Sequence, residues 1–299
     1  MKADGRFKAR LVVQGWAQQH GIDLLFEPFV MKLRKSLYGL RQSPNIWNKT
    51  IDNDLREMGF APTISDPCVY TKGHGESYTM LTLFVDDLLT TGPSDKIVNM
   101  ARDILMAKFA MTDLGNVSQI LGIEINRDGK EGTIELTPRK YTISLLKRFN
   151  MSDCNPVHTP GTGKELASQP EGSMLLDEIA TKGYQAIVGS LIFLTQCTRF
   201  DIAFSTMQAA RHMSKPTNIH MASVKRILRY LKGTPSMPIV YKRAGSFNLF
   251  GYCDTSYGQG DPDKMSSVSG CLFFIAGGLA HFSSQLQKIS AQSSSEAEL

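Results

Sequence analysis

One short stretch, Leu83 to Leu89, limits the possible fold more than any other part of the chain. Two apolar runs flank the pair Asp86-Asp87 and leave room only for a tight turn. This predicts a β-hairpin with both carboxylates at its tip. Such a tip suits Mg²⁺, which usually binds one or two carboxylates together with substrate phosphates. The alternative is a turn without any ligand, because Asp is also a common turn residue.

Four amphipathic helices are predicted from caps and apolar spacing. They begin at Ser43, Ser94, Thr137 and Thr217 or Asn218. We expect Ser43 to be the N-cap of the first helix and Ile104 to face inward from the second. The fourth helix ends at Gly233 and has an apolar stripe that consists of Val224, Ile227, Leu228 and Leu231. Its other faces are basic and include Lys225, Arg226 and Arg229.

Strand-like runs alternate irregularly with these helices, which favours an α+β architecture over a doubly wound parallel sheet. The predicted strands are 78–84, 88–91, 120–125, 133–136, 248–253 and 270–275. The segment from Pro156 to Gly172 is rich in Pro, Gly, Ser and Thr and is the best linker candidate. A second break is expected at 244–246.

Charge is distributed unevenly along the chain. The net charge of +5 arises within residues 1–56, and no acidic residue occurs between Asp201 and Asp254. Two basic surfaces favour a polyanionic partner such as nucleic acid, although a solvated basic face without a partner explains the same composition. His212 and His220 border the second basic surface and are candidates for phosphate contact.

The remaining composition describes an ordinary globular chain without an apolar run that could cross a membrane. No basic and apolar leader opens the sequence. The five cysteines are odd in number and form no CxxC pair, so we expect them to be reduced and mostly core-filling. A cytoplasmic or nuclear location follows as an expectation.

Several motifs occur in a fixed order along the chain. They include Lys35-Ser36-Leu37-Tyr38-Gly39-Leu40-Arg41-Gln42-Ser43-Pro44, Val85-Asp86-Asp87, Leu121-Gly122-Ile123-Glu124, Leu228-Arg229-Tyr230-Leu231-Lys232-Gly233-Thr234, Gly251-Tyr252-Cys253-Asp254 and Ser294-Ser295-Glu296-Ala297-Glu298. With these motifs the chain resembles the reverse transcriptase and ribonuclease H region of copia-type retrotransposon Pol polyproteins.

The resemblance implies a role for each matched position. Asp86 and Asp87 would be polymerase carboxylates, and Asp254 and Glu298 would be ribonuclease H carboxylates, with Mg²⁺ bound at both sites. Gly39 and Gln42 would lie near the incoming nucleotide and template, and Leu121-Gly122 would belong to a hairpin that grips the primer. The implied partners are an RNA template, a DNA primer, an RNA-DNA hybrid and, in an active enzyme, a deoxynucleoside triphosphate. Lys225, Arg226 and Arg229 are our predicted phosphate contacts.

Two departures from the family pattern bear on activity. Val30 runs directly into Met31, where the family has a long stretch with the first catalytic aspartate. Two-metal phosphoryl transfer holds two cations ~4 Å apart and needs carboxylates from more than one strand. The sequence stops at Leu299, before the later ribonuclease H acids, so we expect this chain to be catalytically defective at both sites.

The resemblance implies an incomplete palm, a helical thumb or connection, and a truncated ribonuclease H-like strand set. We expect an N-terminal remnant at 1–30, the palm at 31–160, the linker and thumb or connection at 161–245, and the ribonuclease H-like segment at 246–299. Three functions remain open: a working RNA-directed DNA polymerase, a nucleic-acid-binding module without catalysis, and a decayed fragment.

Overall fold

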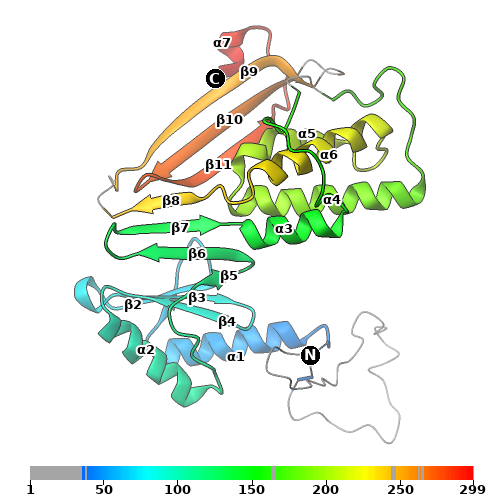
Figure 1. Ribbon diagram of the computed structural model, residues 1–299. Helices are drawn as coiled ribbons and strands as arrows, with labels where there is room; N and C mark the ends of the chain where they lie inside the picture. The colour runs from blue at the N-terminus through cyan, green and yellow to red at the C-terminus, as the bar shows by residue number, and fades with distance from the viewer. Residues whose placement is uncertain are drawn as a thin grey trace, which may run out of the picture. The chain divides into compact units, whose positions relative to one another are not determined.

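The computed structural model describes residues 36–37, 39–162, 166–243, 247–261, 263 and 266–298. The predictions for residues 1–30 and for the break at 244–246 lie outside these ranges. The chain divides into two compact units, residues 1–115 and 116–299. The predicted α+β class is confirmed, because helices pack on antiparallel sheets in both units (Figure 1).

The first unit contains a four-stranded sheet in the order β1-β2-β3-β4. The strands are β1 (Ala61–Pro62), β2 (Val69–Lys72), β3 (Thr79–Phe84) and β4 (Asp87–Thr91), with a short 3₁₀ turn, η2, at Gly75–Ser77. Helices α1 (Ser43–Glu57) and α2 (Asp95–Lys108) share one buried cluster with the sheet. Its members are Ile51, Leu55, Phe60, Tyr70, Leu81, Leu83, Ala101 and Leu105.

Two local predictions in this unit are wrong. Gln42, and not Ser43, is the N-cap of α1, and the Ser43 hydroxyl instead donates to the Leu37 carbonyl over 2.6 Å. Ile104 is 44% exposed, because α2 buries only the narrow stripe of Ala101 and Leu105.

The second unit contains two antiparallel sheets and a group of helices. One sheet has the order β5-β6-β7-β8 and the other the order β11-β10-β9. The strands are β5 (Gln119–Ile120), β6 (Ile123–Asp128), β7 (Thr133–Thr137), β8 (Ile239–Lys242), β9 (Phe250–Asp261), β10 (Ser266–Ile275) and β11 (Gly278–Leu286). The helices are α3 (Arg139–Arg148), α4 (Glu178–Cys197), the 3₁₀ turn η3 (Phe200–Ile202), α5 (Ala203–Arg211), α6 (Asn218–Gly233) and α7 (Ser294–Glu298).

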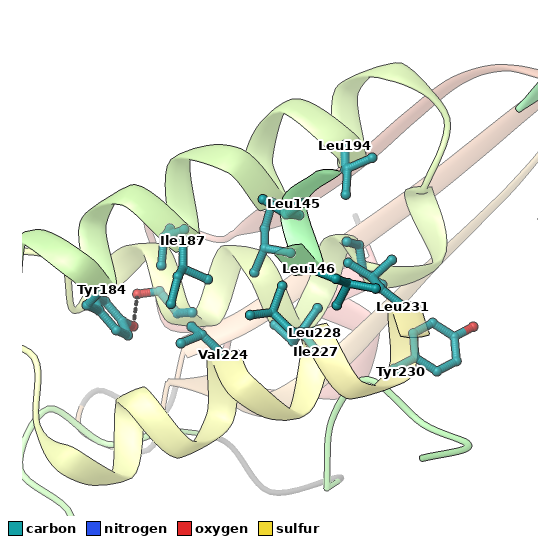
Figure 2. Packing of buried hydrophobic residues seen from close by; sticks show 14 residues of the cluster. Leu145, Leu146, Tyr184, Ile187, Leu194, Val224, Ile227, Leu228, Tyr230 and Leu231 are labelled. Carbon is teal, nitrogen blue, oxygen red and sulfur yellow. Dashed lines mark hydrogen bonds between the residues drawn. The ribbon is translucent and has the colours of Figure 1, made fainter. Parts of the chain in front are cut away.

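The core of this unit lies among α3, α4, α5 and α6. The predicted stripe of α6 is confirmed, since all four of its residues are fully buried. Figure 2 shows this stripe facing Leu145 and Leu146 of α3, with Ile187 of α4 close by. The Tyr184 hydroxyl donates to the Ala209 carbonyl over 2.7 Å and ties α4 to α5. Burial of this ring raises the pKa of the Tyr184 hydroxyl well above its ordinary value.

Exposed aromatic side chains lie on β9, at one edge of the sheet that β9, β10 and β11 form. In Figure 1 the three strands run side by side, and β9 is one of the two edge strands of this sheet among the described residues. Phe250 is 46% and Tyr252 is 66% exposed. Both rings contact Phe274 of β10, at centroid distances of 5.5 and 6.3 Å.

The cysteines do not fill the core as expected. Cys253 is exposed, and Cys68, Cys154, Cys197 and Cys271 are partly buried. All five are free thiols, as predicted.

None of the described helices combines the length and apolar character that a membrane crossing requires.

Candidate functional site

The Asp86-Asp87 pair lies at the tip of the β3–β4 hairpin, as the sequence predicts. The register pairs Phe84 with Asp87, which leaves Val85 and Asp86 as a two-residue turn. Val85 has a φ of 54°, a left-handed conformation that a β-branched residue rarely adopts. Such a residue stores about 1–3 kcal/mol of strain and persists only where its surroundings hold it.

A side chain from α1 holds this strained turn. The Trp47 indole nitrogen Nε1 donates to the Val85 carbonyl oxygen over 2.8 Å. The same indole packs edge-on against Phe109, with ring centroids 5.9 Å apart. Trp47 therefore links the turn to the buried cluster of the first unit. The sequence gives no sign of this role, because a hydrogen bond over 38 residues has no local sequence signal.

Gly39 and Gln42 lie directly before α1, the helix that carries Trp47. Gly39 has a φ of 99°, which favours glycine, and Gln42 is an exposed N-cap. Trp47 thus connects the segment around Gly39 to the hairpin of Asp86, so that two of the sequence motifs meet in the first unit.

The two carboxylates are exposed and occupy different positions of the hairpin. Leu83 and its partner Leu88 belong to the cluster under α1 and α2. Strand alternation therefore places Phe84 and its partner Asp87 on the opposite face, which these two helices do not cover. Asp86 lies in the turn itself.

These side chains do not fit a two-metal site. Within the described ranges, no three His, Cys, Asp or Glu side chains come together in a way that could hold a metal ion. Two adjacent carboxylates suit at most one Mg²⁺ that also binds substrate phosphates, whereas two-metal transfer needs further ligands from other strands.

Leu121 and Gly122 form a turn in the second unit. Their φ values are 51° and 80°, and two successive positive values are typical of a type I′ hairpin turn. The turn joins β5 to β6, with Ile120 opposite Ile123. The prediction of one continuous strand at 120–125 is therefore wrong, because the turn interrupts it, although the hairpin itself agrees with the family motif.

The basic face of α6 contacts this chain's own backbone. Arg229 Nε donates to the Asn155 carbonyl over 2.7 Å. Arg226 donates to the Gly161 carbonyl over 3.2 Å and to the Thr159 hydroxyl over 2.8 Å. Lys225 is exposed. Two of the three predicted phosphate contacts thus hold the segment 155–161 on the helix.

The last residue of the α6 motif also has a structural partner. Arg199 is fully buried and forms two hydrogen bonds to the Asp201 carboxylate, of 2.9 and 2.8 Å. It also donates to the Thr234 carbonyl and hydroxyl, both over 2.7 Å, and lies 5.5 Å from the Tyr230 ring centroid. Thr234 therefore accepts hydrogen bonds from a buried guanidinium group.

His212 and His220 are buried, so the expectation of phosphate contact is wrong. Their rings stack at 4.2 Å, with an interplanar angle of 6°. Nε2 of His212 bonds to the Leu166 carbonyl and Nε2 of His220 to the Ala167 carbonyl. The Thr217 backbone N–H donates to Nδ1 of His220, which requires the tautomer with its proton on Nε2. Burial lowers the pKa of both imidazoles.

Comparison with known proteins shows the family. A model described as reverse transcriptase (RNA-dependent DNA polymerase) matches residues 26–162. The putative transposon Ty5-1 protein of Saccharomyces cerevisiae is 31% identical over 90% of this chain and 86% of its own length. The chain belongs to the copia-type retrotransposon Pol polyproteins.

Two longer copia-type relatives are similar over most of this chain. The Pol polyprotein of transposon TNT 1-94 from Nicotiana tabacum is 33% identical over all of this chain, and that of transposon RE1 from Arabidopsis thaliana is 35% identical over 90% of it. The copia-type chain spans only 27% and 18% of their respective lengths. No solved structure matches it.

The structure does not bring the two expected ribonuclease H carboxylates of this copia-type chain together on one face of the sheet. Helix α7, which ends at Glu298, packs on β9 and β10. Gln287 Nε2 links the Ala297 carbonyl to the Ser269 hydroxyl, and Ser269 pairs with Thr255. Asp254 precedes Thr255, so strand alternation directs it to the face opposite α7.

Proposed function

We propose that this chain is a reverse transcriptase region of a copia-type element that does not catalyse nucleotide transfer. The observation that carries the proposal is the isolation of Asp86 and Asp87 at one hairpin tip, without a third acid nearby among the described residues. Neighbouring positions on one hairpin cannot surround two cations, because the ligands must converge from several elements.

The alignment with the tobacco relative supports a loss of sequence. It extends over 363 residues, which exceeds the 299 residues of this chain. The tobacco protein therefore carries residues in the aligned region that have no counterpart here. We propose that these include the strand with the first polymerase aspartate, at the junction of Val30 and Met31.

The proposal includes the finer domain assignment. Residues 31–160 would be an incomplete palm, 161–245 a linker and a thumb or connection, and 246–299 a ribonuclease H-like segment. Asp254 and Glu298 would be the carboxylates of that segment. Their different faces support a second site that is also inactive. The proposed location is the cytoplasm or the nucleus.

Primer extension tests the catalytic part of the proposal. The purified chain is incubated with a primed RNA template, the four deoxynucleoside triphosphates and Mg²⁺ or Mn²⁺, beside an intact copia-type reverse transcriptase as positive control. We expect no extension, and no cleavage of an RNA-DNA hybrid. Extension that disappears in Asp86→Asn would refute the proposal and would require a ligand from outside the expected strand.

Nucleic-acid binding without catalysis is the second candidate function. The observation that favours it is the acid-free segment from Ile202 to Cys253, in which Lys225 is exposed. Each phosphate contact on a duplex contributes a slope of roughly −0.9 in log K against log salt. Affinity for an RNA-DNA hybrid at several salt concentrations is compared for the parent and Lys225→Ala. An unchanged slope and affinity would leave decay as the better account.

A further inference from the structure

Two cysteines face each other between an edge strand and the central strand of the last sheet. The register places Cys253 of β9 directly opposite Cys271 of β10. Cys253 is exposed, Cys271 is partly buried, and both are free thiols. Side chains of directly opposite residues in an antiparallel pair lie on the same face of the sheet.

Hydrogen bonds along β9 show whether the two cysteines form a hydrogen-bonded or a non-hydrogen-bonded pair. The Thr255 backbone N–H donates to the Asp254 carboxylate over 2.9 Å, so it points away from β10. Thr255 and its partner Ser269 therefore form a non-hydrogen-bonded pair, and such pairs recur every second residue. Cys253 and Cys271, two residues along each strand, form another.

Non-hydrogen-bonded pairs bring side chains closest together. Their Cα atoms are about 4.5 Å apart, within the span of roughly 4.4–6.8 Å that a disulfide bridges. The neighbouring pair on the same face shows how close opposite side chains come in this part of the sheet. The hydroxyl oxygens of Thr255 and Ser269 are 3.4 Å apart. The two sulfur atoms occupy the equivalent γ positions of their own pair.

We propose that Cys253 and Cys271 are a redox-active dithiol that a small-molecule disulfide oxidises to a cross-strand disulfide. The exposed Cys253 thiolate attacks one sulfur of the small disulfide and releases the first small thiolate. The Cys271 thiolate then attacks the Cys253 sulfur and releases the second. The two protons lost by the cysteines are taken up by the two released thiolates, and the small disulfide is reduced to two thiols.

The product links the edge strand β9 covalently to β10, one residue from Asp254. The remaining cysteines, Cys68, Cys154 and Cys197, lie outside this sheet and have no partner in its register. The proposal does not depend on the proposed function, because it requires only the register of β9 and β10.

The experiment uses oxidised glutathione as the small disulfide. The parent chain is treated under native conditions, its remaining thiols are counted, and linked peptides are identified by mass spectrometry. We expect the loss of two thiols, a Cys253–Cys271 linked peptide, and reversal by dithiothreitol. Cys154→Ser is the matched control and should form the same link.

Single variants separate the two steps. Cys271→Ser should stop at a glutathione adduct on Cys253, whereas Cys253→Ser should form no cross-strand link. Far-UV circular dichroism checks that each variant is folded. The parent alone suffices to overturn the proposal, which fails if folded parent yields only single adducts, or if its links are no more selective than those formed in denaturant.

Discussion

Trp47 and Val85 are joined by a 2.8 Å hydrogen bond between the indole Nε1 and the turn carbonyl. This bond connects the first turns of α1 to the tip of the β3–β4 hairpin. A left-handed valine is an unfavourable turn residue, so the position of Asp86 and Asp87 depends on a side chain distant in sequence. The tip is thus positioned by the core beneath it as well as by its own turn residues.

Trp47→Phe should loosen the hairpin tip while keeping an aromatic ring against Phe109. The lost hydrogen bond is expected to lower the free energy of unfolding by about 1 kcal/mol. Faster amide hydrogen exchange at residues 84–88 and a urea titration measure the two effects. Phe109→Leu is the control, because it removes ring packing and retains the indole bond. Unchanged exchange at the tip in Trp47→Phe would contradict the assigned role.

Breaking the buried ion pair of Arg199 should destabilise the second unit strongly. Asp201→Asn leaves the fully buried guanidinium without its anion, and such losses cost about 3–5 kcal/mol. Glu178→Gln is the matched control, since its pair with Lys182 is 82% and 72% exposed and is expected to contribute less than about 1 kcal/mol. Urea unfolding compares both variants with the parent. Equal effects would show that burial does not distinguish the two pairs.

Arg229→Ala should act mainly on stability. Removing its bond to the Asn155 carbonyl is expected to lower the free energy of unfolding by about 1.5–3 kcal/mol, the range for hydrogen bonds from charged groups. Lys225→Ala, on the same helix but exposed, should change it by less than about 0.5 kcal/mol. Denaturant titrations of the two variants, with hybrid-binding assays at one salt concentration, separate folding from binding. A stable Arg229→Ala chain with weakened binding would restore a phosphate role for this residue.

Stability should depend on pH through the stacked histidines. The pKa of both is lowered in the folded state, chiefly by burial, and the proximity of His220 also lowers the pKa of His212. Arg211 lowers the pKa of His212 further, and Asp263 opposes this shift. Above about pH 7.5 both imidazoles are neutral in the folded state and in the unfolded state. As the pH falls through about 6.5 the unfolded state takes up protons first, so the free energy of unfolding falls.

The expected slope approaches about 1.4 kcal/mol per pH unit for each histidine. Urea titrations between pH 5.5 and 8 measure it. His212→Asn should flatten the profile, because it removes one of the two buried imidazoles. A parent that is equally stable throughout this range would refute the prediction.

Local patterns in the sequence predicted much of this fold. The hairpin at Asp86, the capped helix α6 and the buried stripe that includes Val224 follow from turn chemistry, capping and helical spacing, which act over a few residues. Helix α4 was not predicted, because its apolar residues extend around much of the helix and produce little periodic contrast. The strand break at Leu121 was missed because its left-handed conformation is unusual for leucine.

The site was less predictable than the fold. The contacts of the motif residues are made over long separations in the sequence, as the bond from Trp47 to Val85 and the bond from Arg229 to Asn155 show. Arg226 and Arg229 looked like phosphate ligands because a sequence shows charge without showing what already binds it. The structure places backbone carbonyls of the segment 155–161 against both guanidinium groups.

The edge position of β9 also has a consequence for the chain in solution. A strand of twelve residues with one unpaired edge in the described part of the chain exposes backbone donors and acceptors, and Phe250 and Tyr252 add apolar area beside them. Such an edge is a template for further strands. Self-association through the edge of β9 should therefore rise with concentration, and covering that edge should weaken it.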